Sequence, residues 1–357
     1  MFPRFTRLIR GLGGAASSLF RGQVRTGWEA LADELQIAAL SWRYGVPGAR
    51  SPRTTDLVLS DERLPSDHVH LSIAPGGVLL GPLPTERNAF HSRFRRYRIF
   101  VTLACDRVPP PNEVREFVLS LGDGHYEEKI ANRTTLVFNR RRGSPAGIVL
   151  IPNVDFARTY GHAHRRRKID RALRPWAERI PKAVWRGSST GVDHGGENPR
   201  LQLCRAGLVL QEFADFRIGR LLQTEAHSPA AVAVAEGLVG NFLSPEEQIN
   251  YRWLVSIDGN AGEWEGMFWK LYSGCPVLMV ASQWEQWYTS LLKPWEHFIP
   301  VAADLSDLEE RLHWCRAHDE ESRQIGERAR SLLRTEVTFE RALDYLAAAL
   351  SQVPPAG

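Results

Sequence analysis

The chain has 357 residues, of which 43% are hydrophobic and 24% charged, and this composition excludes a disordered, collagen-like or purely coiled-coil protein. At about 150 residues per domain, the length predicts two domains. Lys and Arg number 45 against 41 Asp and Glu. This small positive excess does not require nucleic acid, but it suits a surface that meets anionic ligands or an anionic membrane.

The cysteines are sparse and contain no Cys-x-x-Cys pair, which excludes a zinc knuckle or a thioredoxin motif. They predict reduced, mostly buried thiols in a cytosolic protein. No run of about 18 apolar residues is present, so no segment is predicted to span a bilayer. The basic start, residues 1–22, fits a short amphipathic segment on a membrane surface and a frayed terminus equally well.

The first half alternates candidate helices and strands, which predicts an α/β domain. A near-helical spacing of apolar residues predicts a helix over 25–45. A second helix is predicted over 111–122, with Pro111 near its start and Gly122 at its end. The predicted strands are 68–74, 77–81, 98–105, 134–140 and 148–152. The basic stretch that follows, 162–176, is either an exposed, solvated helix face or a contact for an anionic acceptor or a membrane.

The second half continues the alternation. Asn198 and Pro199 are typical of a helix N-cap and first turn. Capping boxes are predicted at Ser244 with Glu247 and at Ser306 with Glu309. The predicted strands are 181–187, 252–259 and 276–281, and the last two flank a helix over roughly 263–272, which makes a βαβ unit. A final helix carries apolar residues on one face and is expected to cross back to the first domain; they are Phe339, Leu343, Leu346 and Leu350.

A polar, glycine-containing turn between a predicted strand and a predicted helix is the first candidate site. It consists of Trp185, Arg186, Gly187, Ser188, Ser189, Thr190 and Gly191. Small residues let backbone N–H groups approach a phosphate, and a helix N-terminus favours negative charge. Arg200 falls in the first turn of that helix, where a cation opposes the helix dipole, which favours a ligand-facing purpose. A plain strand–turn–helix connection is the alternative.

A second candidate lies at the carboxyl end of a predicted strand, where open α/β sheets bind ligands. Asp258, Gly259 and Asn260 begin this turn. Asp258 or Glu263 is suited to accept hydrogen bonds from sugar hydroxyls, and Trp264 to stack on a ring. The alternative is a simple turn. A third segment, 284–298, mixes aromatic and polar residues, which fits carbohydrate binding and an interdomain core equally well.

Three ordered stretches together carry a family resemblance. They are AVWRGSSTG with the later Arg200, then RWLVSIDGNAGEWEGMFWKLYSGCPVLMV, then QWYTSLLKPWEHFIPVAADLSDLEERLHWC. They resemble glycosyltransferase family 90, which includes fungal capsule-associated proteins, animal protein O-glucosyltransferases and bacterial lipopolysaccharide-modifying enzymes. The second and third stretches look most like the bacterial lipopolysaccharide core type. The resemblance covers about residues 148–335.

The resemblance implies a GT-B architecture, in which two Rossmann-like domains face each other across a cleft. The predicted boundaries are 1–178 for the acceptor side, 179–335 for the nucleotide-sugar side and 336–357 for the C-terminal helix. By motif position, Ser188 and Arg200 would contact the phosphate or sugar of a UDP-sugar, with Ser189 and Thr190 nearby. No metal or other cofactor is expected, in keeping with the missing Asp-x-Asp motif.

The sequence departs from the animal members at two places. Those members carry a diphosphate-binding Arg on the helix after the glycine turn, where this chain has Glu265 and Gly266, so Lys270 or Arg186 would have to compensate. They also use an upstream Asp as catalytic base. The corresponding region here, 139–143, has no carboxylate, and Asp155 is the nearest alternative.

The sequence therefore predicts a cytoplasmic enzyme, peripheral at the inner membrane face, that moves a sugar from a UDP-sugar to a glycan or lipid-linked oligosaccharide, lipopolysaccharide core or capsule. The transfer would invert the anomeric centre. A non-catalytic carbohydrate- or lipopolysaccharide-binding protein on a decayed transferase fold is the alternative. Nucleic-acid binding through the basic stretch is a third reading, without support from any recognised module.

Overall fold

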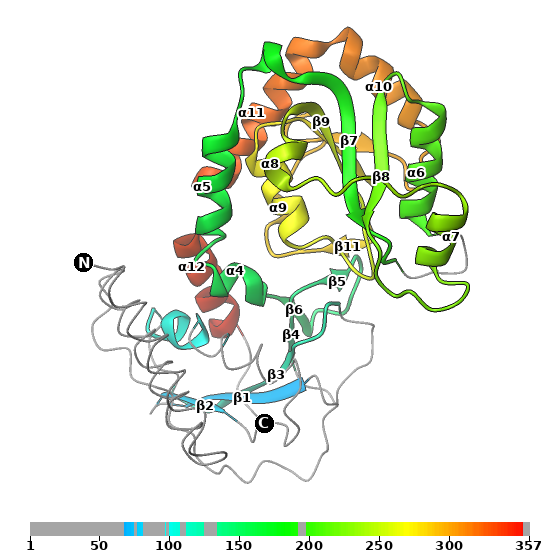
Figure 1. The fold of residues 1–357 in the computed structure, drawn as a ribbon. Coiled ribbons are helices and arrows are strands. Elements are labelled where there is room, and N and C mark those ends of the chain that lie inside the picture. The colour runs from blue at the N-terminus through cyan, green and yellow to red at the C-terminus, as the bar shows by residue number, and fades with distance from the viewer. Residues whose placement is uncertain are drawn as a thin grey trace, which may run out of the picture.

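The computed structural model describes residues 68–74, 77–80, 97, 100–107, 112–124, 134–191 and 198–352 (Figure 1). The helix predicted over 25–45 and the basic start of the chain lie outside these residues. Two five-stranded sheets organise the described chain, with the strand orders β2-β1-β3-β4-β6 and β12-β10-β9-β7-β8. Both contain parallel strands, so the predicted α/β class is confirmed.

The first sheet is mixed. Its strands are β1 (His68–Ala74), β2 (Gly77–Leu80), β3 (Arg115–Ser120), β4 (Thr134–Val137) and β6 (Ile148–Leu150). β1 runs antiparallel to β2 and β3, whereas β3, β4 and β6 run parallel. The strands β3, β4 and β6 keep the parallel pairing of an α/β sheet, and β1 adds the antiparallel pairs at one edge region.

Two predictions in the first half are wrong. The segment 111–122 contains β3 and is not a helix; Phe117, Val118 and Leu119 are consecutive and fully buried, as in a central strand covered on both faces. The segment 98–105 is helical from 100 onward and is not a strand. Its core-facing residues recur at helical spacing and are all buried: Tyr97, Phe100, Val101 and Ala104.

The second sheet is parallel throughout. Its strands are β7 (Ile180–Ser188), β8 (Ala214–Arg220), β9 (Tyr251–Ser256), β10 (Val277–Val280) and β12 (Ile299–Val301). Helix α9 (Glu265–Tyr272) connects β9 to β10, which confirms the predicted βαβ unit. From β7 the chain adds β8 on one side and β9 on the other, so the strand order reverses between β7 and β9. In open α/β sheets ligands bind outside the carboxyl ends of strands at such a switch point.

Two of the three predicted helix N-termini, at Asn198 and Ser244, are confirmed by the structure. The Asn198 side chain accepts from the backbone N of Arg200 and caps α6 (Pro199–Val209). Ser244 and Glu247 form the predicted capping box of α8 (Pro245–Gln248). The box predicted at Ser306 is wrong, because α10 (Leu308–Ala317) begins after Asp307, whose carboxylate instead accepts from the backbone N of Ala302 at 2.8 Å.

The remaining elements cover the sheets or join them. They are β5 (Arg140–Arg141), α4 (Val154–Arg158), α5 (Ala163–Ala172), α7 (Pro229–Ala235), β11 (Trp284–Glu285), α11 (Asp319–Thr335), α12 (Phe339–Ser351) and two 3-10 turns at Trp176–Glu178 and Thr289–Leu291. β5 and β11 pair with each other and so link the two halves of the chain. None of the described helices is both long and apolar enough to cross a bilayer.

Helix α12 packs against the first half, as predicted. The rings of Phe339 and Phe100 lie 5.3 Å apart, and Arg107 pairs with Asp344. One buried apolar cluster contains residues of the first sheet, of α9 and of α12, among them Leu136, Phe268 and Leu346. A continuous core therefore joins the two halves, while the domain boundaries 1–178, 179–335 and 336–357 stay a prediction.

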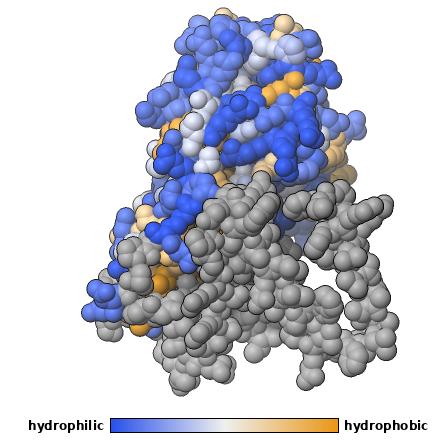
Figure 2. All heavy atoms as spheres, turned by 90° about the vertical axis from the view of Figure 1, so that its left-hand side faces the viewer, coloured by the Kyte–Doolittle hydropathy of each residue, from blue (hydrophilic) through white to orange (hydrophobic). Residues whose placement is uncertain are grey.

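Part of the basic helix α5 is engaged within the protein, whereas His164, Arg167 and Arg171 are exposed. Arg165 pairs with Glu246 and Glu265, both from the second half. His162, which was expected to be solvated, is 2% exposed and lies against the rings of Phe156 and Phe268, and burial lowers its pKa to about 3. Figure 2, which views the molecule from the side of α5, shows a mostly hydrophilic surface over the second half.

Candidate functional site

Arg200 joins the two loops that flank the switch point. Its Nη1 donates to the carbonyl oxygen of Ser188 at 3.1 Å, to Ser188 Oγ at 3.0 Å and to Thr190 Oγ1 at 2.9 Å. Its Nε donates to the carbonyl oxygen of Asp258 at 2.8 Å. The residue is 8% exposed. One buried guanidinium therefore fixes the carboxyl end of β7 against the carboxyl end of β9.

The hydroxyls of Ser188 and Thr190 gain a defined orientation from this contact. Their oxygens lie 2.8 Å apart, and both accept from Arg200. A hydroxyl carries one proton and two lone pairs, so one proton serves the bond between the two hydroxyls. The second proton remains to be donated to a ligand. With the N-terminus of α6, this corner suits an anion.

Two glycines at this corner cannot be replaced without rearrangement. A Cβ at Gly187 would lie 2.4 Å from the Trp185 ring, and a Cβ at Gly259 would lie 2.8 Å from Arg200 Nη2. The strand register between β7 and β8 also shifts between Gly187 and Ser188, and such irregularities re-aim side chains. The loop after β9, which contains Gly259, can therefore approach Arg200 closely.

Two residues predicted for the same loop point elsewhere. Ser189 is fully buried, and its Oγ donates to the carbonyl oxygen of Leu222 at 2.7 Å. Arg186 pairs with Asp215 of β8 at 2.7 Å and donates to the carbonyl oxygen of Asn241. The structure therefore brings Ser188, but neither Ser189 nor Arg186, to the side chain of Arg200.

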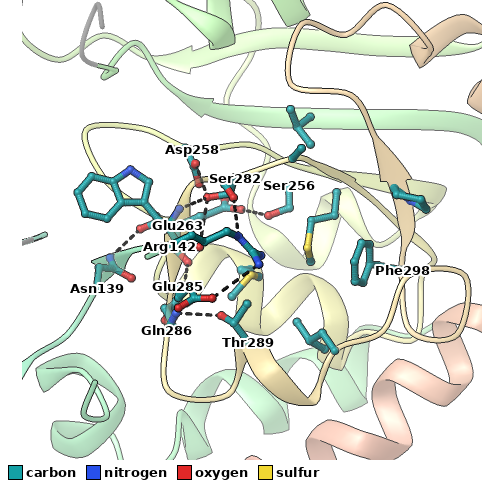
Figure 3. Close-up of a pocket in the computed structure, with 18 of the residues that line it drawn as sticks. Asn139, Arg142, Ser256, Asp258, Glu263, Ser282, Glu285, Gln286, Thr289 and Phe298 are labelled. Atoms are coloured by element: carbon teal, nitrogen blue, oxygen red, sulfur yellow. Dashed lines mark hydrogen bonds and ion pairs between the residues drawn. The ribbon is translucent and has the colours of Figure 1, made fainter. Parts of the chain in front are cut away.

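A pocket of about 630 Å³ opens beside this corner, at the carboxyl ends of β9, β10 and β12 (Figure 3). Most of its wall comes from the second half, and Asn139 and Arg142 come from the first. The polar lining residues are Asn139, Arg142, Ser256, Asp258, Glu263, Ser282, Glu285, Gln286, Thr289 and Ser290. The apolar lining includes Met267, Met279, Trp284, Leu292 and Phe298. Hydrogen-bonding groups beside rings are typical of a sugar or nucleoside site.

Asp258 is the carboxylate with the most perturbed environment in this pocket. Its Oδ2 accepts from Ser282 Oγ at 2.6 Å. Burial is the largest cause that raises its pKa to about 6, and the charge of Glu263 adds to the rise while Arg200 opposes it. A carboxyl group that titrates near neutrality and lines a pocket is suited to move a proton.

The charge of Glu263 is neutralised by Lys270, a residue outside the pocket lining. Its Oε1 pairs with Lys270 Nζ at 2.5 Å, and its Oε2 accepts from Ser256 Oγ at 2.7 Å. Lys270 is 2% exposed, and burial lowers its pKa. It does not line the pocket. The predicted contact of Lys270 with a diphosphate would therefore require breaking a buried ion pair.

The remaining predicted residues divide between the loop and the core. Asn260 lies half-buried in the loop after β9. Trp264 packs edge-on against Phe138 at 5.7 Å and joins the shared apolar cluster. Asp155 is 43% exposed at the start of α4, pairs with Arg158 at 3.1 Å, and is not among the pocket residues.

The aromatic segment 284–298 contributes both to the shared core and to the pocket wall, and carbohydrate binding by it stays a prediction. Trp287 is buried against Phe156 and Tyr345, so it belongs to the shared core. Trp284 and Phe298 line the pocket. No local pattern singled out Arg142, because its place in the pocket depends on the pairing of β5 with β11. Ser282 lies two residues after β10, at the carboxyl end of a predicted strand. Within the described residues no group of three His, Cys, Asp or Glu side chains is placed to hold a metal ion.

Comparison with known proteins identifies a family and several relatives that this chain is similar to. The family described as "Glycosyl transferase family 90" matches residues 161–353, more than half of the chain. Uncharacterized protein 035R of Invertebrate iridescent virus 3 is 35% identical over 186 residues, which are 50% of this chain and 17% of the viral protein. Human Protein O-glucosyltransferase 1 is 28% identical over 181 residues, 50% of this chain and 43% of the human protein.

The chain thus matches less than half the length of these curated relatives. Among solved structures, that of TarM is similar with a TM-score of 0.37 and 15% identity, over 50% of this chain and 37% of that chain. This likeness is too low to support an argument about the arrangement of domains.

The raised pKa of Asp258 predicts a specific pH dependence of stability. Its unfolded value is about 3.9, so the folded state holds this proton to higher pH, and the free energy of unfolding falls as the pH rises from about 4 to about 6. Asp258→Asn removes this titration while keeping an acceptor for Ser282. Relative to the variant, the wild type should lose up to about 3 kcal/mol across that range, measured by urea unfolding between pH 4 and 7.

Asp155→Asn is the control, because Asp155 is an exposed carboxylate outside the pocket. This variant keeps Asp258 and should still show the fall in the free energy of unfolding between about pH 4 and pH 6. A constant difference between wild type and Asp258→Asn from pH 4 to 7 would contradict the assigned environment of Asp258.

Proposed function

The chain belongs to glycosyl transferase family 90, and we propose that it transfers a sugar from a UDP-sugar to a hydroxyl of an acceptor. One observation carries the proposal: Arg200 joins the two loops at the switch point and orients the hydroxyls of Ser188 and Thr190. These groups suit the diphosphate of the donor. The adjoining pocket, with its carboxylates and rings, suits the sugar or the nucleoside.

The leaving group is stabilised without a metal ion in this proposal. A free hydroxyl proton of Ser188 or Thr190 and the positive end of the α6 dipole face the developing negative charge, while the first N–H groups of α6 stay bound to Asn198. Such preorganised donors are worth about 3 kcal/mol each in a transition state. Arg200 acts here as a positioning residue, since its own donors are engaged by Ser188, Thr190 and Asp258.

The chemical step is an inverting displacement. The acceptor oxygen forms a bond to the anomeric carbon while the bond from that carbon to the diphosphate oxygen breaks, and the electron pair leaves with the diphosphate. A carboxylate takes the acceptor's proton. Asp155 was the base suggested by the sequence, but it lies outside the pocket. We assign the proton to Asp258, whose raised pKa and place in the wall favour it.

The acceptor class rests on similarity alone. The resemblance to lipopolysaccharide core enzymes supports a lipopolysaccharide or capsule acceptor, with the protein in the cytoplasm and peripheral at the membrane. The relative named Protein O-glucosyltransferase 1 supports a protein hydroxyl as the second acceptor to test. A GT-B arrangement, with the acceptor on the side of the first sheet, is part of the same proposal.

Adjacent serines in one loop provide a matched test of the donor site. Ser188→Ala should weaken binding of the donor at least about tenfold, because a hydrogen bond to a charged group contributes about 1.5–3 kcal/mol. It should lower thermal stability less than Ser189→Ala does, because Arg200 Nη1 keeps the carbonyl oxygen of Ser188 and Thr190 Oγ1 as acceptors. Ser189→Ala should lower stability, because Leu222 loses a buried partner, and should leave donor affinity unchanged. Calorimetric titration with UDP-sugars and thermal unfolding measure both.

Equal donor affinity for wild type and Ser188→Ala would contradict the site. If wild-type protein bound none of a panel of UDP-, GDP- and CMP-sugars, the transferase proposal itself would fail in favour of a carbohydrate-binding protein.

The base assignment has its own test in nucleotide release from the bound donor. Asp258→Asn should lower release about 100-fold or more with little change in donor affinity, whereas Asp155→Asn should behave like the wild type. The wild-type rate should rise with pH through about 6 as Asp258 ionises. The opposite result, loss in Asp155→Asn only, would return the role to Asp155.

A further inference from the structure

Arg142 is the one basic side chain among the described residues that line the pocket. It belongs to the first half, whereas most of the wall belongs to the second. Its backbone N donates to the carbonyl oxygen of Gln283 at 2.7 Å, and its Nε donates to the carbonyl oxygen of Ser282 at 3.1 Å. The side chain is 60% exposed, so its guanidinium is anchored at one edge and open to a ligand at the other (Figure 3).

The carboxylates around Arg142 have other partners. Glu263 is paired with the buried Lys270. Glu285 lies 3.2 Å from Arg140 Nε and 3.6 Å from Arg142 Nη1, so it keeps the nearer partner if Arg142 turns to a ligand. The charge of Asp258 is offset by the neighbouring Arg200, and its Oδ2 already accepts from Ser282 Oγ. The charge left available to an incoming group in the pocket is therefore positive, and it sits on Arg142.

A short chain of contacts connects Arg142 to the corner at Arg200. Arg142 donates to the Ser282 carbonyl, Ser282 Oγ donates to Asp258, and the Asp258 carbonyl accepts from Arg200. Two residues thus separate the two guanidinium groups along this chain. A ligand with two linked phosphoryl groups is suited to contact the hydroxyls beside Arg200 with one group and Arg142 with the other.

We propose that Arg142 binds the donor diphosphate, so that the first half supplies a cation to a site built mainly by the second. This inference rests on the proposed function for the identity of the ligand. On binding, the guanidinium exchanges its long contact with Glu285 for phosphoryl oxygens, and Glu285 stays with Arg140. The pairing of β5 with β11 is then a requirement of the donor site, because it positions Arg142 over the pocket.

The test compares nucleoside diphosphates with nucleosides. Calorimetric titrations of the full chain use UDP, GDP, uridine, guanosine and inorganic pyrophosphate, with wild type, Arg142→Gln, Arg142→Lys and the control Arg158→Gln. Arg158 is a partly exposed arginine outside the pocket. Arg142→Gln should weaken the preferred nucleoside diphosphate at least about tenfold and its nucleoside less than twofold. The loss should shrink at high ionic strength, and Arg142→Lys should recover part of it.

The remaining outcomes show whether the Arg142 inference or the proposed transferase function fails. Unchanged diphosphate affinity in Arg142→Gln would overturn the inference and leave the transferase proposal standing. An equal loss for nucleoside and nucleoside diphosphate would show a merely structural role and would also overturn it. If wild type bound no nucleotide, the proposed function would fail; pyrophosphate binding that depends on Arg142 would then still support the anion site, and its absence would overturn the site as well.

Discussion

The hydrogen bonds of the buried Arg200 guanidinium are the interaction on which the candidate site depends. A buried charge is costly unless its donors are used, and here they bind oxygens of the loops that follow β7 and β9. The loop after β9 can approach because Gly259 has no side chain to meet Arg200, and Gly187 leaves room for the Trp185 ring. The same interaction sets which hydroxyl protons face a ligand. Arg200 therefore contributes to the fold, to stability and to the proposed recognition of the ligand.

Local signals predicted several elements of the second half, but they missed the strands β8 and β12. The cap at Asn198, the capping box at Ser244 and the βαβ unit are encoded by neighbouring residues, so no tertiary information was needed. The first half was harder, because a short, fully buried apolar run fits a strand and a helix equally. For this reason 98–105 was predicted as a strand and 111–122 as a helix. The buried Phe100 and Phe117 do not distinguish the two; the pairing of β3 with β1 and β4 does.

The candidate site was predicted as a region but not in its side-chain roles. The sequence located the loop 185–191, and the family resemblance singled out Ser188 together with Arg200. The residues alone do not separate Ser188 from Ser189, because the register shift in β7 decides which hydroxyl meets Arg200. Trp264 is taken up by core packing. Arg142 reaches the pocket because β5 pairs with β11, a strand about 140 residues away in sequence. No local sequence pattern predicts this pairing.

The most direct test of the account is hydrogen exchange of the backbone amides with and without a saturating nucleoside diphosphate. If the donor binds at the switch point, the amides of 187–191 and of 258–262 should both exchange more slowly in the complex, because one buried guanidinium couples the two loops. Helix α5, which is paired elsewhere, should be unchanged. Protection confined to one of the two loops, or found only outside both, would contradict the central role of Arg200.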